Sequence, residues 1–206
     1  MQAVTTLYLV VSAQTAAEQK GLFPGPADHI LSAEGMRQIR LLSTRLSDQQ
    51  IDSFYSGPYE AAFATASALS ARHRRGVIRL PDLVDMEFGE WAGKTTAQVQ
   101  KSDPEGLIAW RFTPHQHRMP GGETLQEVQS RVVAAVEEIV SAEQGRGICM
   151  VADAIPVKAA MSHFLNEDLS MFWITPAQES AALSIITWEE GEHTLALVGS
   201  REHLEG

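Results

Sequence analysis

The chain has 206 residues, enough for one α/β domain over residues 1–206 with a complete hydrophobic core. Hydrophobic residues make up 44% of it and charged residues 20%, which is ordinary for a soluble globular protein. The formal net charge of −10 argues against nucleic acid and against an anionic membrane surface as partners.

Cysteine usage and the N-terminus bear on the compartment. Cys149 is the only cysteine, so no intrachain disulfide can form, as expected in a reducing compartment. No lysine or arginine precedes Lys20, so the apolar start lacks the basic residues of a secretion signal. No run approaches the roughly 18 apolar residues of a membrane helix. We therefore expect a cytoplasmic protein.

The first predicted element is a buried strand over residues 6–11, because its apolar run shows no helical spacing. Small and polar residues follow it directly, among them Ser12, Gln14 and Thr15. Ligands of open α/β sheets bind beyond the carboxyl ends of the strands. The sequence therefore predicts a binding site at this loop.

The rest of the chain alternates between strand and helix patterns. Ser32 is a good N-cap for a helix with Met36, Ile39 and Leu42 on one face. Further helices are expected over 61–71, 125–139 and 155–165, and strands over 51–56, 77–80, 147–151, 181–188 and 194–198. This alternation predicts a three-layer α/β sandwich, with a mostly parallel central sheet and helices on both faces.

A segment at about 82–122 interrupts this alternation and is rich in Trp, Pro and Gly. Helices are expected within it over 95–101 and 104–112. Long ordered insertions of this kind are often lids or binding loops. We therefore interpret the segment as an insertion that helps to cover the site.

Six segments, in order along the chain, resemble the histidine phosphatase superfamily, the phosphoglycerate-mutase-like proteins. They cover residues 7–15, 51–66, 83–93, 120–124, 149–154 and 203–204. One of them, Phe88-Gly89-Glu90-Trp91-Ala92-Gly93, is similar to the family's Phe-Gly-x-Trp-x-Gly. The resemblance implies the family's α/β fold over nearly the whole chain.

The resemblance also shows where the chain departs from the family's chemistry. The family uses two histidines, one of them the nucleophile, and two arginines; these positions fall on Val11, Ser12, Ala61 and Asp153. The family's general-acid Glu falls on Asp85. At an effective dielectric near 20, each unit-charge contact at about 4 Å is worth on the order of 4 kcal/mol. Losing these cations and gaining the negative charge of Asp153 therefore predicts that micromolar phosphate binding, worth about 8 kcal/mol, is abolished.

On this basis we predict a catalytically inactive member, a pseudoenzyme rather than a functional phosphatase or mutase. It would bind an unidentified small molecule or protein partner in or near the remnant pocket. The candidate pocket residues are Ser12, Asp85 and Asp153. Candidate binding residues around it, including two arginines of the insertion, are Gln14, Thr15, Tyr59, Arg111, Arg118 and Glu123.

Three alternatives stay open. Asp85 and Asp153 could act as acid and base in a lyase or isomerase, because paired carboxylates shift one another's pKa. A residual phosphomonoesterase could use Ser12 as a rearranged nucleophile. A pure scaffold could present the apolar segment 171–174 as an exposed patch, whereas a homo-oligomer is an option for the predicted pseudoenzyme. His115 and His117 have no Cys or acidic residue nearby, so we expect no metal and no cofactor.

Overall fold

The computed structural model describes residues 4–176 and 179–205. Within them, one sheet has the strand order β3-β2-β4-β1-β5-β6. Four strands run parallel: β1 (Thr5–Val11), β2 (Ser53–Ser56), β3 (Val77–Arg79) and β4 (Gly147–Ala152). The hairpin of β5 (Leu183–Glu189) and β6 (Glu192–Ser200) extends the sheet antiparallel. The predicted mostly parallel sheet is confirmed.

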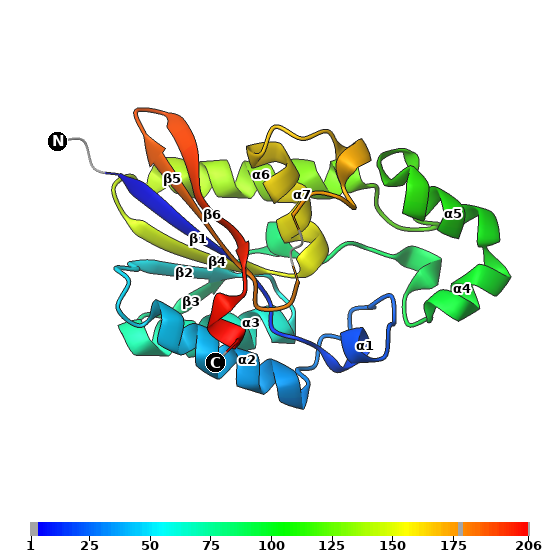
Figure 1. Cartoon of the computed structure of the whole chain (residues 1–206), viewed down its shortest axis with the longest axis horizontal. Coiled ribbons are helices and arrows are strands. Elements are labelled where there is room, and N and C mark those ends of the chain that lie inside the picture. Colours follow the sequence, from blue (N-terminus) through cyan, green and yellow to red (C-terminus); the bar gives the residue numbers. More distant parts are fainter. Residues whose placement is uncertain (1–3, 177–178, 206) are drawn as a thin grey trace.

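Helices cover both faces of the sheet (Figure 1). On one face lie α2 (Ala33–Leu46) and α3 (Glu60–His73), and on the other α6 (Leu125–Ala142) and α7 (Ala154–Phe164). Side chains alternate along a strand, so Tyr8 and Val10 of β1 join the core under α2 and α3. Leu7, Leu9 and Val11 join the core under α6 and α7. The central strand is therefore buried on both faces.

Helix starts follow the expected capping chemistry. The Ser32 hydroxyl accepts the N–H of Gly35 at the start of α2, as predicted. The α6 helix begins with a capping box, in which Thr124 and Glu127 satisfy each other's backbone N–H groups.

The segment from 81 to 116 lies beyond the carboxyl ends of the parallel strands (Figure 1). It contains η1 (Pro81–Leu83), η2 (Gly89–Trp91), α4 (Thr96–Ser102), α5 (Pro104–Phe112) and η3 (Pro114–Gln116). The two predicted helices are confirmed. Trp91 and Trp110 are buried and anchor this segment to the core.

Besides η1, η2 and η3, the short elements that were not predicted include α1 (Ala16–Gln19), η4 (Leu169–Met171) and η5 (Glu202–Leu204). Each is too short to show a hydrophobic period. In the apolar segment at 171–174, Phe172 is buried, whereas Trp173 and Ile174 are 42% and 70% exposed. Among the described helices, none has the length and apolar character needed to span a membrane.

Candidate active site

The centre of the site follows from the register of two neighbouring strands. β1 and β4 are parallel, and Val11 pairs with Ala152 at their carboxyl ends. The next residue of each strand, Ser12 and Asp153, therefore lies at the same edge of the sheet. The Ser12 hydroxyl donates a hydrogen bond of 2.6 Å to Asp153 Oδ1, and both side chains are buried.

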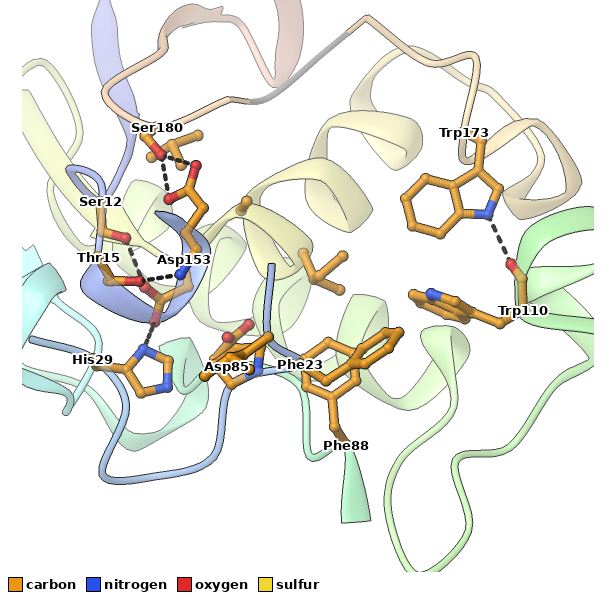
Figure 2. A pocket seen from close by; sticks show the side chains of 16 residues that line it. Ser12, Thr15, Phe23, His29, Asp85, Phe88, Trp110, Asp153, Trp173 and Ser180 are labelled. Carbon is orange, nitrogen blue, oxygen red and sulfur yellow. Dashed lines mark hydrogen bonds and ion pairs between the residues drawn. The ribbon is translucent and has the colours of Figure 1, made fainter. Parts of the chain in front are cut away.

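Two loops bring further titratable groups to this pair (Figure 2). Asp85 follows η1, and its Oδ1 accepts the N–H of Met86 at 2.8 Å. His29 lies in the loop before α2, with Nδ1 3.6 Å from Asp153 Oδ2. The imidazole stacks on Tyr59 with 4.2 Å between the ring centroids. The predicted trio of Ser12, Asp85 and Asp153 thus lines one cavity, together with His29.

The sequence interpretation missed His29. The residue stands between glycine- and proline-rich turns and the N-cap of α2, in a stretch without period or motif. Its burial arises from packing on Tyr59, a contact between distant segments. No local signal marks such a residue.

Burial controls the electrostatics of the cluster. Burial, together with the nearby Asp153 carboxylate, raises the pKa of Asp85 to about 7, even though His29, the Met86 N–H and Arg131 act to lower it. Burial alone would lower the pKa of His29, but Asp153, Asp85 and Asp28 together outweigh it, so the pKa lies above its ordinary value. Both groups therefore hold their protons more tightly than the same side chains do in water.

Arg131 of α6 fixes the position of Asp85 without lining the cavity. Its guanidinium donates to the carbonyl oxygens of Val84, at 2.7 Å, and of Asp85, at 3.2 Å. It also binds the Glu123 carboxylate at 2.9 Å. Sequence interpretation missed this role as well, because the contacts are to backbone atoms 46 and 47 residues away.

The other end of the cavity is aromatic. Phe23, Phe88, Trp110 and Trp173 line it opposite the polar cluster (Figure 2). The rings of Trp110 and Trp173 meet edge to face at 5.0 Å, and the Trp173 indole N–H donates to the Trp110 carbonyl at 2.8 Å. The cavity volume is about 230 Å³, enough for a small organic molecule. Among the described residues, no lysine or arginine lines it.

The remaining predicted binding residues lie at different distances from this cavity. Thr15 lines it, although its hydroxyl also caps α1. Gln14 accepts a hydrogen bond from Ser32, and Tyr59 lies behind the His29 ring. Arg111 lines a neighbouring hollow that shares Trp110 and Trp173.

Arg118 and Glu123 do not line the cavity. Arg118 is paired with Glu127 and with the Gly122 carbonyl. The Glu123 carboxylate binds Arg131 instead. Direct ligand contacts by these two residues stay a prediction from the sequence.

A family model described as "Histidine phosphatase superfamily (branch 1)" matches residues 7–201. The chain belongs to this superfamily. The predicted family is therefore confirmed, over nearly all of the sequence.

Curated relatives match the chain along most of its length. Phosphoserine phosphatase 1 of Hydrogenobacter thermophilus is 29% identical over 198 residues, covering 96% of this chain and 93% of the relative. The adenosylcobalamin/alpha-ribazole phosphatase of Escherichia coli is 30% identical over 192 residues, covering 87% of this chain and 94% of the relative. Both names describe phosphatases.

Solved structures give the same fold. Bacillus stearothermophilus YhfR superposes with a TM-score of 0.93 at 25% identity, over 97% of this chain and 99% of that one. The alpha-ribazole phosphatase from Shigella flexneri superposes with a TM-score of 0.84 at 25% identity, over 95% and 96%.

These findings contradict the predicted pseudoenzyme. The prediction rested on the missing histidines and arginines, yet relatives that match over nearly the full length are named as phosphatases. Of the alternatives drawn from the sequence, the phosphomonoesterase fits the relatives best. The acid/base alternative keeps a geometric basis, since Asp85 and Asp153 face one cavity, but no such activity is named among the relatives described above.

Proposed function

We propose that this protein hydrolyses phosphomonoesters with Ser12 as the nucleophile, in a site that lacks the histidines and arginines of the family pattern. The observation that carries the proposal is the buried hydrogen bond from Ser12 Oγ to Asp153 Oδ1, 2.6 Å long, in the cavity at the strand ends. A nucleophile and a base within hydrogen-bond reach are the minimum for covalent catalysis. The phosphatase names of the relatives support the same reaction class.

The proposed reaction has two balanced steps. Ser12 Oγ attacks phosphorus, its proton passes to Asp153, and Asp153 returns that proton to the departing alcohol oxygen. Water then attacks the phosphoserine, giving its proton to Asp153, which restores the Ser12 hydroxyl as inorganic phosphate leaves. Phosphoryl transfer depends mainly on positioning and charge stabilisation. The Asp153 carboxylate, hydrogen-bonded to the Ser12 hydroxyl, accepts and returns the one proton that each step moves.

The start of α7 supports phosphate binding. Ala154 and Ile155, the first residues of the helix, line the cavity. Asp153 is the N-cap residue, but its side chain makes no capping hydrogen bond and instead holds Ser12. The first N–H groups of a helix lack intrahelical acceptors and favour anions. Phosphate oxygens at this position would lie next to the Ser12 hydroxyl.

The aromatic end of the cavity indicates the leaving group. Four aromatic side chains form its wall, and no lysine or arginine among the described residues lines it. A second anionic group on the substrate, such as the carboxylate of phosphoserine, would find no cationic side chain there. The cavity therefore favours a phosphate ester of a bulky apolar or aromatic alcohol.

Phosphate release from 1-naphthyl phosphate, with phosphoserine as comparison substrate, tests the proposal. We expect turnover of the aryl ester by the wild type and loss of at least 10³-fold in Ser12→Ala, because the nucleophile is removed. Ser56→Ala is the matched control: Ser56 is another buried serine at the end of a parallel strand, but it does not line the cavity. Ser12→Ala with wild-type turnover, or a wild type that releases no phosphate, would overturn the proposal.

A further inference from the structure

In the proposed reaction, the negative charge of the phosphate is not balanced by the side chains around it. A phosphomonoester dianion at Ser12 would lie beside the Asp153 carboxylate. Among the described residues lining the cavity, His29 is the one that can carry a positive charge. Like charges about 4 Å apart repel by on the order of 4 kcal/mol at an effective dielectric of 20. Something more cationic than one imidazole is needed for tight phosphate binding.

The same cavity holds a group of metal-ligating side chains. His29, Asp85 and Asp153 each offer one ligand atom, and these atoms all lie within 4.8 Å of one another. The three residues are only 4%, 6% and 5% exposed. They come from three loops far apart in the sequence, so the fold itself assembles the group.

The distance between His29 Nδ1 and Asp153 Oδ2 fits a shared ion better than a hydrogen bond. At 3.6 Å it is too long for a normal hydrogen bond. Two ligands of a tetrahedral zinc ion, each at about 2.1 Å, are roughly 3.4 Å apart. A small shift of either side chain would therefore bring both atoms to coordination distance.

A buried oxygen without a hydrogen bond gives further support. Asp153 Oδ2 is buried and accepts no hydrogen bond from the described part of the chain. Its companion Oδ1 is taken by Ser12. Burying a carboxyl oxygen without a hydrogen bond costs free energy, and native proteins normally satisfy such atoms with a donor, water or an ion.

We propose that His29, Asp85 and Asp153 bind one divalent transition-metal ion of the Zn²⁺ class, with a coordination position open to the cavity. One nitrogen and two carboxylate oxygens suit zinc, and three protein ligands leave a position for water or substrate. Binding of the ion stands on the cluster alone, whereas its role in catalysis rests on the proposed phosphomonoesterase. There the ion would neutralise phosphate oxygens next to Ser12.

Neighbouring contacts hold the ligands in place. Tyr59 stacks on the His29 ring, and Arg131 binds the backbone carbonyls of Val84 and Asp85. Partners of this kind orient metal ligands and reduce the cost of ordering them. The sequence interpretation expected no metal site in the protein, and it did not single out His29.

Zinc binding to chelator-treated protein, measured by isothermal titration calorimetry, tests the site. We expect one equivalent of Zn²⁺ in the wild type and affinity lowered at least 100-fold in Asp85→Asn and Asp153→Asn, which keep side-chain shape. Glu18→Gln is the matched control, because Glu18 lines the same cavity through its bond to Ser180 but is not in the cluster. Circular dichroism checks that each variant is folded. The proposed site would be contradicted if the wild type bound no Zn²⁺, or if both Asp variants bound Zn²⁺ with the same affinity as the wild type.

Two further measurements separate this inference from the proposed function. Ser12→Ala should bind Zn²⁺ as the wild type does while losing phosphate release. Zinc bound at the cluster with no turnover would support the site and overturn the proposed hydrolysis. Wild-type turnover that persists unchanged after chelation would overturn the metal's role and leave the hydrolysis standing.

Discussion

The two ends of the cavity are built in different ways. The polar end takes Ser12 and Asp153 from adjacent strand ends and fixes them by a hydrogen bond and strand register. The aromatic end takes Trp110 and Trp173 from separate segments beyond the sheet and fixes them by ring packing. The polar end thus depends on polar contacts at the strand ends, while the aromatic end depends on apolar burial. Each end should respond differently to substitution.

The largest effect on stability is expected at the aromatic end. Trp110→Ala removes a buried side chain that packs on Phe88, Phe172 and Trp173. Loss of such a residue typically costs about 3–5 kcal/mol, since the surrounding groups cannot fully close the void. Urea denaturation at neutral pH measures it. The exposed neighbour Phe112 provides the control, because Phe112→Ala removes a side chain that is 76% exposed. Equal losses in the two variants would show that Trp110 does not anchor the wall.

An intermediate, pH-dependent effect is expected at the polar end. Burial, with the Asp153 charge, raises the pKa of Asp85 to about 7 from an ordinary 3.8. The folded state holds this proton more tightly than the unfolded state. Its contribution to the free energy of unfolding is therefore fully present below about pH 4. It is lost as the pH rises toward 7, by on the order of 2–4 kcal/mol.

Urea denaturation across this pH range, with a chelator present to exclude metal ions, measures the loss. Asp85→Asn carries no titrating proton, so its stability should change less with pH than that of the wild type. A parallel pH profile in the two proteins would contradict the raised pKa and weaken the distinction between the two ends.

The same contrast explains what the sequence could predict. Strand β1 and its following Ser12 were predictable because an apolar run ending in small residues is a local signal, and the family motifs placed Asp153 at the neighbouring strand end. His29 was not predictable, because its burial depends on a stacking contact with Tyr59 across 30 residues of sequence. Likewise, no pattern indicates that Arg131 holds the Asp85 loop through carbonyl oxygens.

The functional error had a related cause. The prediction considered only the four family positions, which hold no histidine or arginine in this chain, so the pocket seemed to have lost all of its positive charge. The structure adds an imidazole from a loop that the pattern does not include, and the relatives carry phosphatase names. The family motifs name only the cations that the family pattern uses, whereas the fold can bring a residue from outside the motifs, such as His29, into the same cavity.

The smallest effect is expected at the hydrogen bond between Trp173 and Trp110. Trp173→Phe keeps an aromatic ring but loses the indole N–H that donates to the Trp110 carbonyl at 2.8 Å. Because Trp173 is 42% exposed, water can replace part of this bond, so stability should fall by only about 0.5–1.5 kcal/mol. Steady-state kinetics with 1-naphthyl phosphate should show a KM raised several-fold and an unchanged kcat, because the wall binds the leaving group without touching phosphorus. A fall in kcat at constant KM would instead place Trp173 in the reacting half of the cavity, and the division between the two ends would not hold.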